Sequence, residues 1–197
     1  MNIYIARHGE SISNAGEYIA YPYTGLSNKG LNDSFALGKC YAEKNIKVDA
    51  IYCSYLFRAL QTLHQFLKEY KKIDPDKIFI TELLNEIDRF DYSGHSSAEY
   101  YADRDASGID PNIFKSPKGE SENDVKNRAI KFNQLIKKDN YSNILIISHG
   151  HFLKHFCDIN NITGVGHLSG ATFSLIKLTE GKSKVISWND SNHIKDQ

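Results

Sequence analysis

Two histidines, His8 and His149, each follow a short apolar run and each precede a glycine. The stretches NIYIARHG from Asn2 and NILIISHG from Asn143 align residue for residue. Such apolar runs predict buried strands. In an open parallel sheet, ligands bind beyond the carboxyl ends of the strands. We therefore expect the two histidines to lie side by side and to face one ligand.

Two arginines and two carboxylates are expected at the same edge. Arg7 precedes the first histidine, and Arg58 falls in the first turn of a predicted helix, where the dipole disfavours a cation. Helix N-termini bind anions, and arginine suits bidentate contact with phosphate. The alternative for Arg58 is a side chain that reaches into solvent. Glu82 and Glu86 follow the third predicted strand.

This combination of residue types indicates phosphoryl chemistry. A histidine can attack phosphorus and hold a covalent intermediate, and arginines neutralise the equatorial oxygens. A carboxylic acid can protonate the leaving oxygen and then activate water. His149 precedes a helix N-terminus, and that dipole with the nearby arginines should discourage its protonation. Gly9 and Gly150 permit a tight turn and close approach of the backbone to a ligand.

The composition excludes several other functions. Lys and Arg total 24, as do Asp and Glu, so no net charge favours nucleic acid or an anionic membrane. Cys40, Cys53 and Cys157 match no metal-binding spacing, and buried free thiols suit a reducing cytosol. A signal peptide and a membrane-spanning run are not expected. We expect a cytoplasmic protein, and its oligomeric state is not readable from the sequence.

The periodicity predicts strands that alternate with helices. Ser27 should cap a helix with an apolar face of Leu31, Phe35, Gly38 and Ala42, and Ser121 to Asp124 resembles a capping box. The following helix along the chain should have an apolar face of Ala59, Leu63, Phe66 and Tyr70. The helix that begins after Ser121 should have an inward face of Val125, Ala129, Phe132 and Ile136. A last helix should span Gly150–Asp158. The predicted strands are Ile3–Ala6, Val48–Cys53, Lys77–Thr81 and Asn143–Ser148, followed by a hairpin of Thr172–Leu178 and Lys184–Trp188 around Glu180-Gly181-Lys182.

This order predicts an α/β fold, a three-layer sandwich with a mostly parallel mixed sheet and helices on both faces. We expect one domain over residues 1–197. A stretch between Arg89 and Gly119, poor in aliphatic residues, is a candidate lid or binding segment, with a solvated insertion as the alternative. Candidate residues for the rim of the site are Tyr21, Tyr23, His95, Tyr100, Tyr101, Arg104, Lys115, Lys118 and His151.

Taken together, these residues resemble those of the histidine phosphatase superfamily, in its phosphoglycerate mutase-like branch. The motifs that carry the resemblance are Arg7–Ser11 with Asn14, Leu26–Gly30, Ser54–Thr62, Leu83–Glu86, Gly119–Ser121 and Ser148–Gly150. The resemblance implies that His8 is the nucleophile that becomes phosphohistidine. It also implies that Glu86, rather than Glu82, is the general acid and base. The rest of the phosphate pocket would be formed by Arg7, Asn14, Arg58, His149 and Gly150.

The sequence departs from the family pattern after Glu86, where Ser93 replaces an acidic residue before Gly94. Phosphoglycerate mutases of this family carry a longer insertion with paired arginines, whereas Arg89 and Arg104 stand singly here. We therefore expect a metal-independent phosphatase that acts on small phosphorylated metabolites and needs no cofactor. The alternatives are a cofactor-dependent phosphoglycerate mutase, a metal site at the histidines, and a non-catalytic phosphate-binding module.

Overall fold

The computed structural model describes residues 1–179 and 182–195. Within them a six-stranded sheet has the order β3-β2-β4-β1-β5-β6. The strands are β1 (Asn2–Arg7), β2 (Ala50–Ser54), β3 (Ile78–Thr81), β4 (Asn143–Ser148), β5 (Phe173–Thr179) and β6 (Lys182–Asp190). The α-helices are α1 (Ile12–Ala15), α2 (Asn28–Glu43), α3 (Phe57–Glu69), α4 (Ser97–Ala106), α5 (Glu122–Asp139), α6 (Gly150–Ile159) and α7 (Asn192–Lys195). Short 3₁₀ turns are η1 (Pro75–Lys77), η2 (Glu82–Leu84) and η3 (Phe90–Tyr92).

The sheet confirms the predicted mixed α/β fold. Strands β1 to β4 pair in parallel, and β5 and β6 add an antiparallel hairpin at the β1 edge. The predicted bounds of Asn143–Ser148 coincide with those of β4, and the ends of the other predicted strands lie within two residues of the observed ones. The predicted turn at Glu180 and Gly181 lies outside the described residues.

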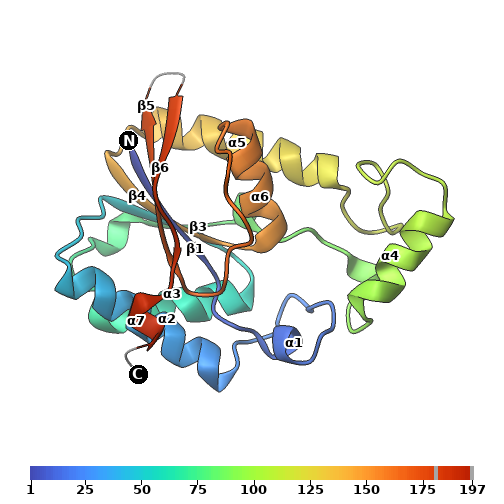
Figure 1. The fold of residues 1–197 in the computed structure, drawn as a ribbon, viewed down its shortest axis with the longest axis horizontal. Helices are drawn as coiled ribbons and strands as arrows, with labels where there is room; N and C mark the ends of the chain where they lie inside the picture. Colours follow the sequence, from blue (N-terminus) through green and yellow to red (C-terminus); the bar gives the residue numbers. More distant parts are fainter. Residues whose placement is uncertain (180–181, 196–197) are drawn as a thin grey trace.

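Alternation along β1 divides the core into two halves. Ile3 and Ile5 face one cluster with residues of α5 and α6, whereas Tyr4 and Ala6 face another with residues of α2 and α3. Successive side chains of a strand point to opposite faces, so a buried strand is apolar on both. Figure 1 shows α5 and α6 on one side of the sheet and α2 and α3 on the other. The three-layer arrangement follows from this pattern.

The helix starts predicted from capping residues are confirmed. Ser27 caps α2 and accepts a hydrogen bond from the Gly30 N–H, and Ser121 forms a capping box with Asp124 at the start of α5. The predicted inward face of α5, Val125, Ala129, Phe132 and Ile136, is fully buried.

The predicted inward face of α2 is partly wrong, because Gly38 is buried and Leu31 and Ala42 are half-buried, but Phe35 is not buried. Phe35 is 37% exposed, while Ser34, Leu37 and Tyr41 are buried. The helix approaches α3 so closely that a Cβ at Gly38 would lie 2.2 Å from the Phe66 carbonyl oxygen. Gly38 therefore lies in the contact with α3, Leu37 and Tyr41 reach the core, and Phe35 is turned outward.

The 89–119 segment contains η3 and α4 and lies apart from the sheet in Figure 1. Arg89 holds it together, because this buried guanidinium stacks on Tyr100 with 4.2 Å between its Cζ and the ring centroid. The Arg89 Nη2 also donates to the Tyr101 hydroxyl at 3.1 Å. Tyr100 is 3% exposed and serves packing.

Candidate active site

The two His-Gly ends lie side by side, as the sequence predicts. β1 pairs with β4 in parallel with Asn2 opposite Asn143 and Arg7 opposite Ser148, the register of the sequence alignment. The His8 N–H donates to the Ser148 carbonyl at 2.9 Å, which extends this pairing by one residue. As a result, the ring centroids of His8 and His149 are 4.9 Å apart.

The imidazole of His8 is set up as a neutral base. Its Nδ1 lies 2.7 Å from the Gly9 carbonyl oxygen, which can only accept, so Nδ1 carries the hydrogen and Nε2 keeps its lone pair. Burial holds the pKa of His8 well below its ordinary value, and the positive charges of Arg58 and Arg7 lower it further. A side chain at Gly9 is excluded, because its Cβ would lie 2.4 Å from the Gly30 carbonyl oxygen.

Both predicted arginines flank these rings. Arg58, the second residue of α3, is only 4% exposed, which excludes the alternative that it reaches into solvent. Burial lowers the pKa of Arg58 to about 10, against the opposing charge of Glu86. The Arg7 Nη1 lies 3.1 Å from His167 Nε2 and donates to the Leu168 carbonyl at 3.2 Å. The Arg7 Nε is buried without a hydrogen-bond partner among the described residues.

A chain of hydrogen bonds determines the tautomer of His149. The Tyr55 N–H donates to Asn85 Oδ1 at 3.1 Å, and the Ser54 hydroxyl donates to the same oxygen at 2.8 Å. With its hydrogen used, Ser54 Oγ accepts from His149 Nε2 at 2.7 Å. The other nitrogen, His149 Nδ1, is buried and has no partner within the described part of the chain. Burial, followed by the charge of Arg58, lowers the pKa of His149 as the sequence predicted.

Glu86 lies against the start of α6. Its carboxylate accepts from the His151 N–H at 3.1 Å and from the Ile87 N–H at 3.0 Å. The first is one of the free amides of a helix N-terminus, where an acidic group is favourable. Glu86 lines the same cavity as His8, whereas Glu82 is exposed and does not line it.

Arg128 on α5, which the sequence analysis missed, clamps the segment that carries Glu86. Its guanidinium donates to the carbonyl oxygens of Leu83 and Asn85, both at 2.9 Å, and to that of Glu86 at 3.3 Å. It also forms a bidentate pair with Glu120, with both distances 2.8 Å. The Gly119–Ser121 motif indicated Glu120, but no local pattern indicated its partner eight residues later.

His151 connects the acid to the 89–119 segment and is more than a rim residue. Its Nδ1 lies 3.0 Å from Glu122 Oε1, and its Nε2 lies 3.1 Å from Arg89 Nη2. Arginine can only donate, so Nε2 accepts and Nδ1 carries the hydrogen. Burial opposes the charged form, but the Glu122 hydrogen bond and the Glu86 charge outweigh it, and the pKa of His151 is raised. Glu122 also binds His155 Nε2 at 2.7 Å.

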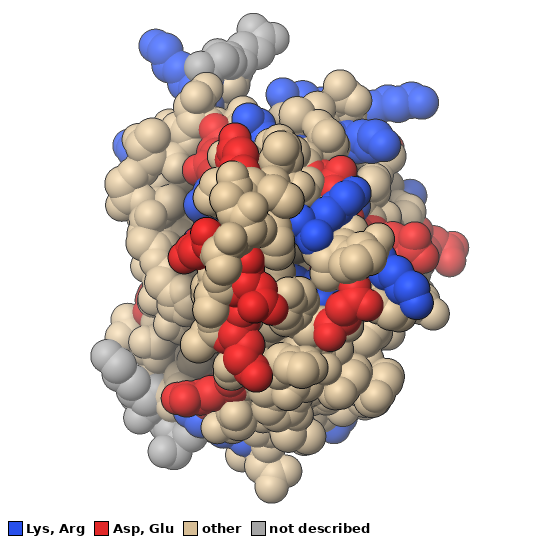
Figure 2. Space-filling model, turned by 90° about the vertical axis from the view of Figure 1, so that its right-hand side faces the viewer, with Lys and Arg blue, Asp and Glu red and all other residues tan. Residues whose placement is uncertain are grey.

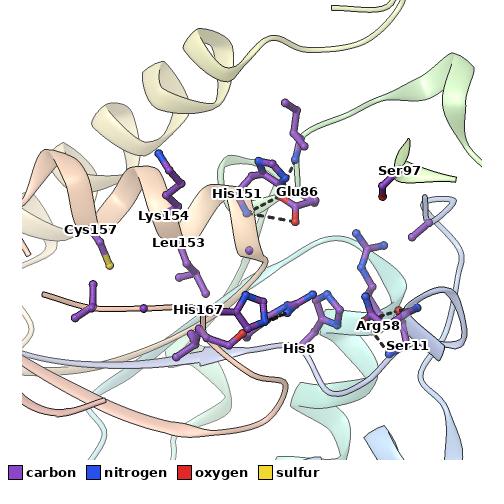
Figure 3. Close-up of a pocket in the computed structure, with 18 of the residues that line it drawn as sticks. His8, Ser11, Arg58, Glu86, Ser97, His151, Leu153, Lys154, Cys157 and His167 are labelled. Carbon is purple, nitrogen blue, oxygen red and sulfur yellow. Dashed lines mark hydrogen bonds between the residues drawn. The ribbon is translucent and has the colours of Figure 1, made fainter. Parts of the chain in front are cut away.

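Arg7, His8, Arg58, Glu86 and His151 line one cavity of about 800 Å³. The predicted pocket residue His149 is fully buried behind it and is not one of its lining residues. Figure 3 shows His8 and Arg58 at one part of it, Glu86 and His151 above them, and Leu153 and Cys157 farther along α6. Asn14 and Gly150 also line it, as predicted, and so do Arg89 and Ser97 from the 89–119 segment. Of the predicted rim residues only His151 lines the cavity; Tyr21, Tyr23, His95, Tyr100, Tyr101, Arg104, Lys115 and Lys118 do not.

The positive charge of the site is local. Arg7 and Arg58 lie inside the cavity, whereas Figure 2 shows many acidic side chains gathered in a band on the face at the α4 end of the molecule. The described residues contain no group of three or more His, Cys, Asp or Glu side chains arranged to hold a metal ion. Among the described helices, none is long and apolar enough to cross a bilayer.

A family model described as the histidine phosphatase superfamily (branch 1) matches residues 3–191. The chain therefore belongs to the histidine phosphatase superfamily. Among curated proteins, it is 36% identical over 69 residues to the 2,3-bisphosphoglycerate-dependent phosphoglycerate mutase of Staphylococcus aureus. That match covers 34% of this chain and 30% of the mutase, so it spans under a third of the relative's length.

Solved structures share the whole fold. The chain is 25% identical to Bacillus stearothermophilus YhfR, with a TM-score of 0.81 and 98% of each chain covered. A putative alpha-ribazole-5'-P phosphatase from Escherichia coli has a TM-score of 0.81 at 21% identity and 97% coverage of both chains. A phosphoserine phosphatase mutant from Entamoeba histolytica, in complex with phosphoserine, has a TM-score of 0.74 at 21% identity and 98% coverage of both.

Proposed function

We propose that this protein is a metal-independent phosphatase that hydrolyses small phosphomonoesters through a phosphohistidine at His8. The observation that carries the proposal is the buried, neutral His8 imidazole, whose Nδ1–H is held by the Gly9 carbonyl and whose Nε2 is free to attack. The buried Arg58, the half-buried Arg7 and the carboxylate of Glu86 line the same cavity. These are the three groups that such a reaction requires.

In the first step, His8 Nε2 attacks phosphorus and the bond to the leaving oxygen breaks. Glu86, as the carboxylic acid, gives its proton to that oxygen, and the alcohol leaves. In the second step, Glu86 as the carboxylate takes a proton from water, and the water oxygen attacks phosphorus. The bond to Nε2 breaks, which releases phosphate and restores neutral His8.

Unpaired polar atoms around the rings support an oxyanion as the ligand. Arg7 Nε is a buried donor that lacks a partner within the described residues, and a phosphoryl oxygen is an acceptor that suits it. Arg58 Nη1 makes only a long bond of 3.4 Å, to the Tyr21 carbonyl. The two positive charges of Arg7 and Arg58 disfavour a metal cation at the same place.

The first test is phosphate release from p-nitrophenyl phosphate in EDTA, with wild type beside His8→Ala. We expect release by wild type and none by the variant. Enzyme incubated with a ³²P-labelled ester and denatured in alkaline detergent should retain a label that later acid treatment removes, and only when His8 is present. Activity that EDTA abolishes, or a variant that keeps appreciable activity, would contradict the proposal.

The role of Glu86 is tested by Glu86→Gln beside Glu82→Gln as the matched control. We expect Glu86→Gln to lower kcat by about 10²- to 10⁴-fold, the usual contribution of general acid–base catalysis. The dissociation constant for inorganic phosphate, measured by calorimetry, should change much less. A larger kcat defect in Glu82→Gln would reverse the assignment.

The local similarity to phosphoglycerate mutases supports a second candidate, phosphoryl transfer between hydroxyls. It predicts interconversion of phosphoglycerates with a bisphosphoglycerate primer, and a phosphohistidine that outlives water attack. Tight phosphate binding without turnover in either assay would instead indicate a non-catalytic binding module.

We also propose that the chain forms one domain in which the 89–119 segment acts as a lid. Arg89 and Ser97 of this segment line the cavity, and Arg89 contacts His151 beside the proposed acid.

A further inference from the structure

The cavity is much larger than a phosphoryl group needs. Its volume of about 800 Å³ falls in the range of about 300–1,000 Å³ that holds a whole drug-sized ligand. Beyond the phosphate site it continues into an apolar arm, lined by Leu153, Cys157, Ile162, Val165, Leu168 and Trp188. None of these six side chains carries a charge, and the polar side chains of Thr163 and His167 from the same loop also line the cavity. The arm is therefore suited to a part of the substrate that makes no ionic contact.

Three separate segments build the apolar arm. Leu153 and Cys157 lie on the face of α6 that also presents Gly150, because positions three and four apart share one face of a helix. The loop after α6 contributes Val165 and Leu168, and Leu168 is held by the hydrogen bond from Arg7 to its carbonyl. The phosphate-binding arginine and the arm are thus directly connected.

A β-bulge brings Trp188 to the arm. Ile176 pairs with Val185 but Leu175 pairs with Ser187, so Ile186 is an extra residue in β6. In an unbroken strand, Val185 and Trp188 would face opposite sides of the sheet. Here both pack on the same core cluster. The Trp188 Nε1 donates to the Gly166 carbonyl at 3.2 Å, so the indole has no further hydrogen to offer a ligand.

The acid stands at the entrance of the arm. Glu86 accepts from the His151 N–H at the start of α6, and Leu153 follows two residues later on this helix. Figure 3 shows Leu153 between His151 and Cys157, above His167. The oxygen that Glu86 protonates belongs to the departing alcohol, so that alcohol has its reacting end where the arm begins.

Polar side chains at the other end of the cavity are already hydrogen-bonded to one another. Ser11 Oγ lies 2.8 Å from both Ser13 Oγ and Asn14 Oδ1. At the outer end of the arm, Lys154 Nζ is paired with Asp158 at 3.0 Å. Sugar hydroxyls or a second phosphate would compete with these bonds, whereas an apolar chain would not.

We propose, building on the phosphatase function above, that the substrate is a phosphomonoester of an alcohol with an apolar chain of several carbons, which lies in the apolar arm. Burial of each methylene contributes about 0.8 kcal/mol, so kcat/KM should rise about three- to fourfold per added methylene until the arm is full. The leaving alcohols of n-alkyl phosphates differ little in acidity, which isolates this effect from the chemistry.

The test compares phosphate release from ethyl, butyl and hexyl phosphate, with glucose 6-phosphate as a six-carbon polar comparator. We expect hexyl phosphate to exceed both ethyl phosphate and glucose 6-phosphate by more than tenfold in kcat/KM. Val165→Phe narrows the arm and should lower the value for hexyl phosphate at least tenfold while leaving ethyl phosphate within twofold. Ile130→Phe, on the exposed face of α5, is the matched control and should change neither.

Binding gives a readout independent of turnover and of the variant's folding. Trp188 is the single tryptophan of the chain, so its fluorescence reports on the arm. Non-hydrolysable hexylphosphonate should shift its emission to the blue, and ethylphosphonate should not. The inference would be overturned by equal kcat/KM values along the alkyl series, by a preference for glucose 6-phosphate, or by an unchanged Trp188 emission. None of these results would contradict the proposed phosphatase function. Binding of hexylphosphonate with that shift, but no turnover of any ester, would retain the arm and reject the phosphatase.

Discussion

The reactivity of the site at the residue scale rests on the charge of His8. A protonated imidazole has no lone pair at Nε2, so the proposed nucleophile, His8, must be neutral at working pH. Burial and two arginines secure this, and the Gly9 carbonyl selects the tautomer. An anionic ligand that neutralises Arg7 and Arg58 would weaken the same effect.

We predict that the Cε1 proton of His8, observed by NMR and assigned with His8→Asn, does not titrate between pH 8 and 6. Arg58→Met removes the larger of the two charge effects and should raise the pKa of His8 toward its ordinary value. Arg104→Met, an arginine outside the cavity, is the control. A wild-type midpoint near or above pH 6.5 would contradict this account.

At the scale of the elements, the contacts of Arg89 connect the 89–119 segment to α6. Arg89 stacks on Tyr100, binds Tyr101 and touches His151, so a single buried side chain joins α4 to the helix that positions Glu86. Protonation of His151 would place an N–H against the Arg89 guanidinium. The Arg89 contact therefore opposes the charged form of His151 that Glu122 and Glu86 favour.

We predict that Arg89→Ala speeds amide hydrogen exchange in α4 by about tenfold or more, since a buried cation–π contact contributes about 2 kcal/mol. Exchange in β1 and β4 should stay unchanged. Arg104→Ala removes a half-buried arginine that also stacks on Tyr101, at 4.8 Å, and should have a smaller effect. Equal effects of the two variants would show that Arg89 does not hold this segment.

Burial of His8 and His149 affects the stability of the whole molecule. In the unfolded chain both histidines bind a proton near pH 6.5, but in the folded protein their pKa values are lower. Below pH 6.5 the unfolded state therefore binds more protons, and folding loses stability as pH falls. The loss approaches about 1.4 kcal/mol per pH unit for each histidine, until the folded pKa is reached.

We predict that the free energy of unfolding in urea falls between pH 7 and pH 5 more steeply for wild type than for His8→Asn. The variant should lose about half of the contribution that the two buried histidines make to the slope. His64→Asn, at an exposed position of α3, controls for the loss of a histidine as such. If the unfolding free energy of His8→Asn falls with pH as steeply as that of wild type, the burial of His8 does not destabilise the fold in acid.

The sequence by itself determined which residues stand at the strand ends. Apolar periodicity located β1 and β4, and their matching His-Gly ends have the register that the sheet adopts. The caps of α2 and α5 are equally local, because Ser27 and Ser121 bind amides only three residues away. Such features depend on spacing along the chain, which the sequence states directly.

Only the tertiary structure decided what surrounds that edge. Phe35 turned outward because Gly38 lets two helices meet closely, Arg128 reached three carbonyls of another segment, and the Ile186 bulge turned Trp188 toward α6. Each depends on the distance between segments far apart in sequence, and a small backbone shift changes it without altering any local pattern. For that reason the sequence could predict phosphoryl chemistry at His8, but not the apolar arm that receives the rest of the substrate.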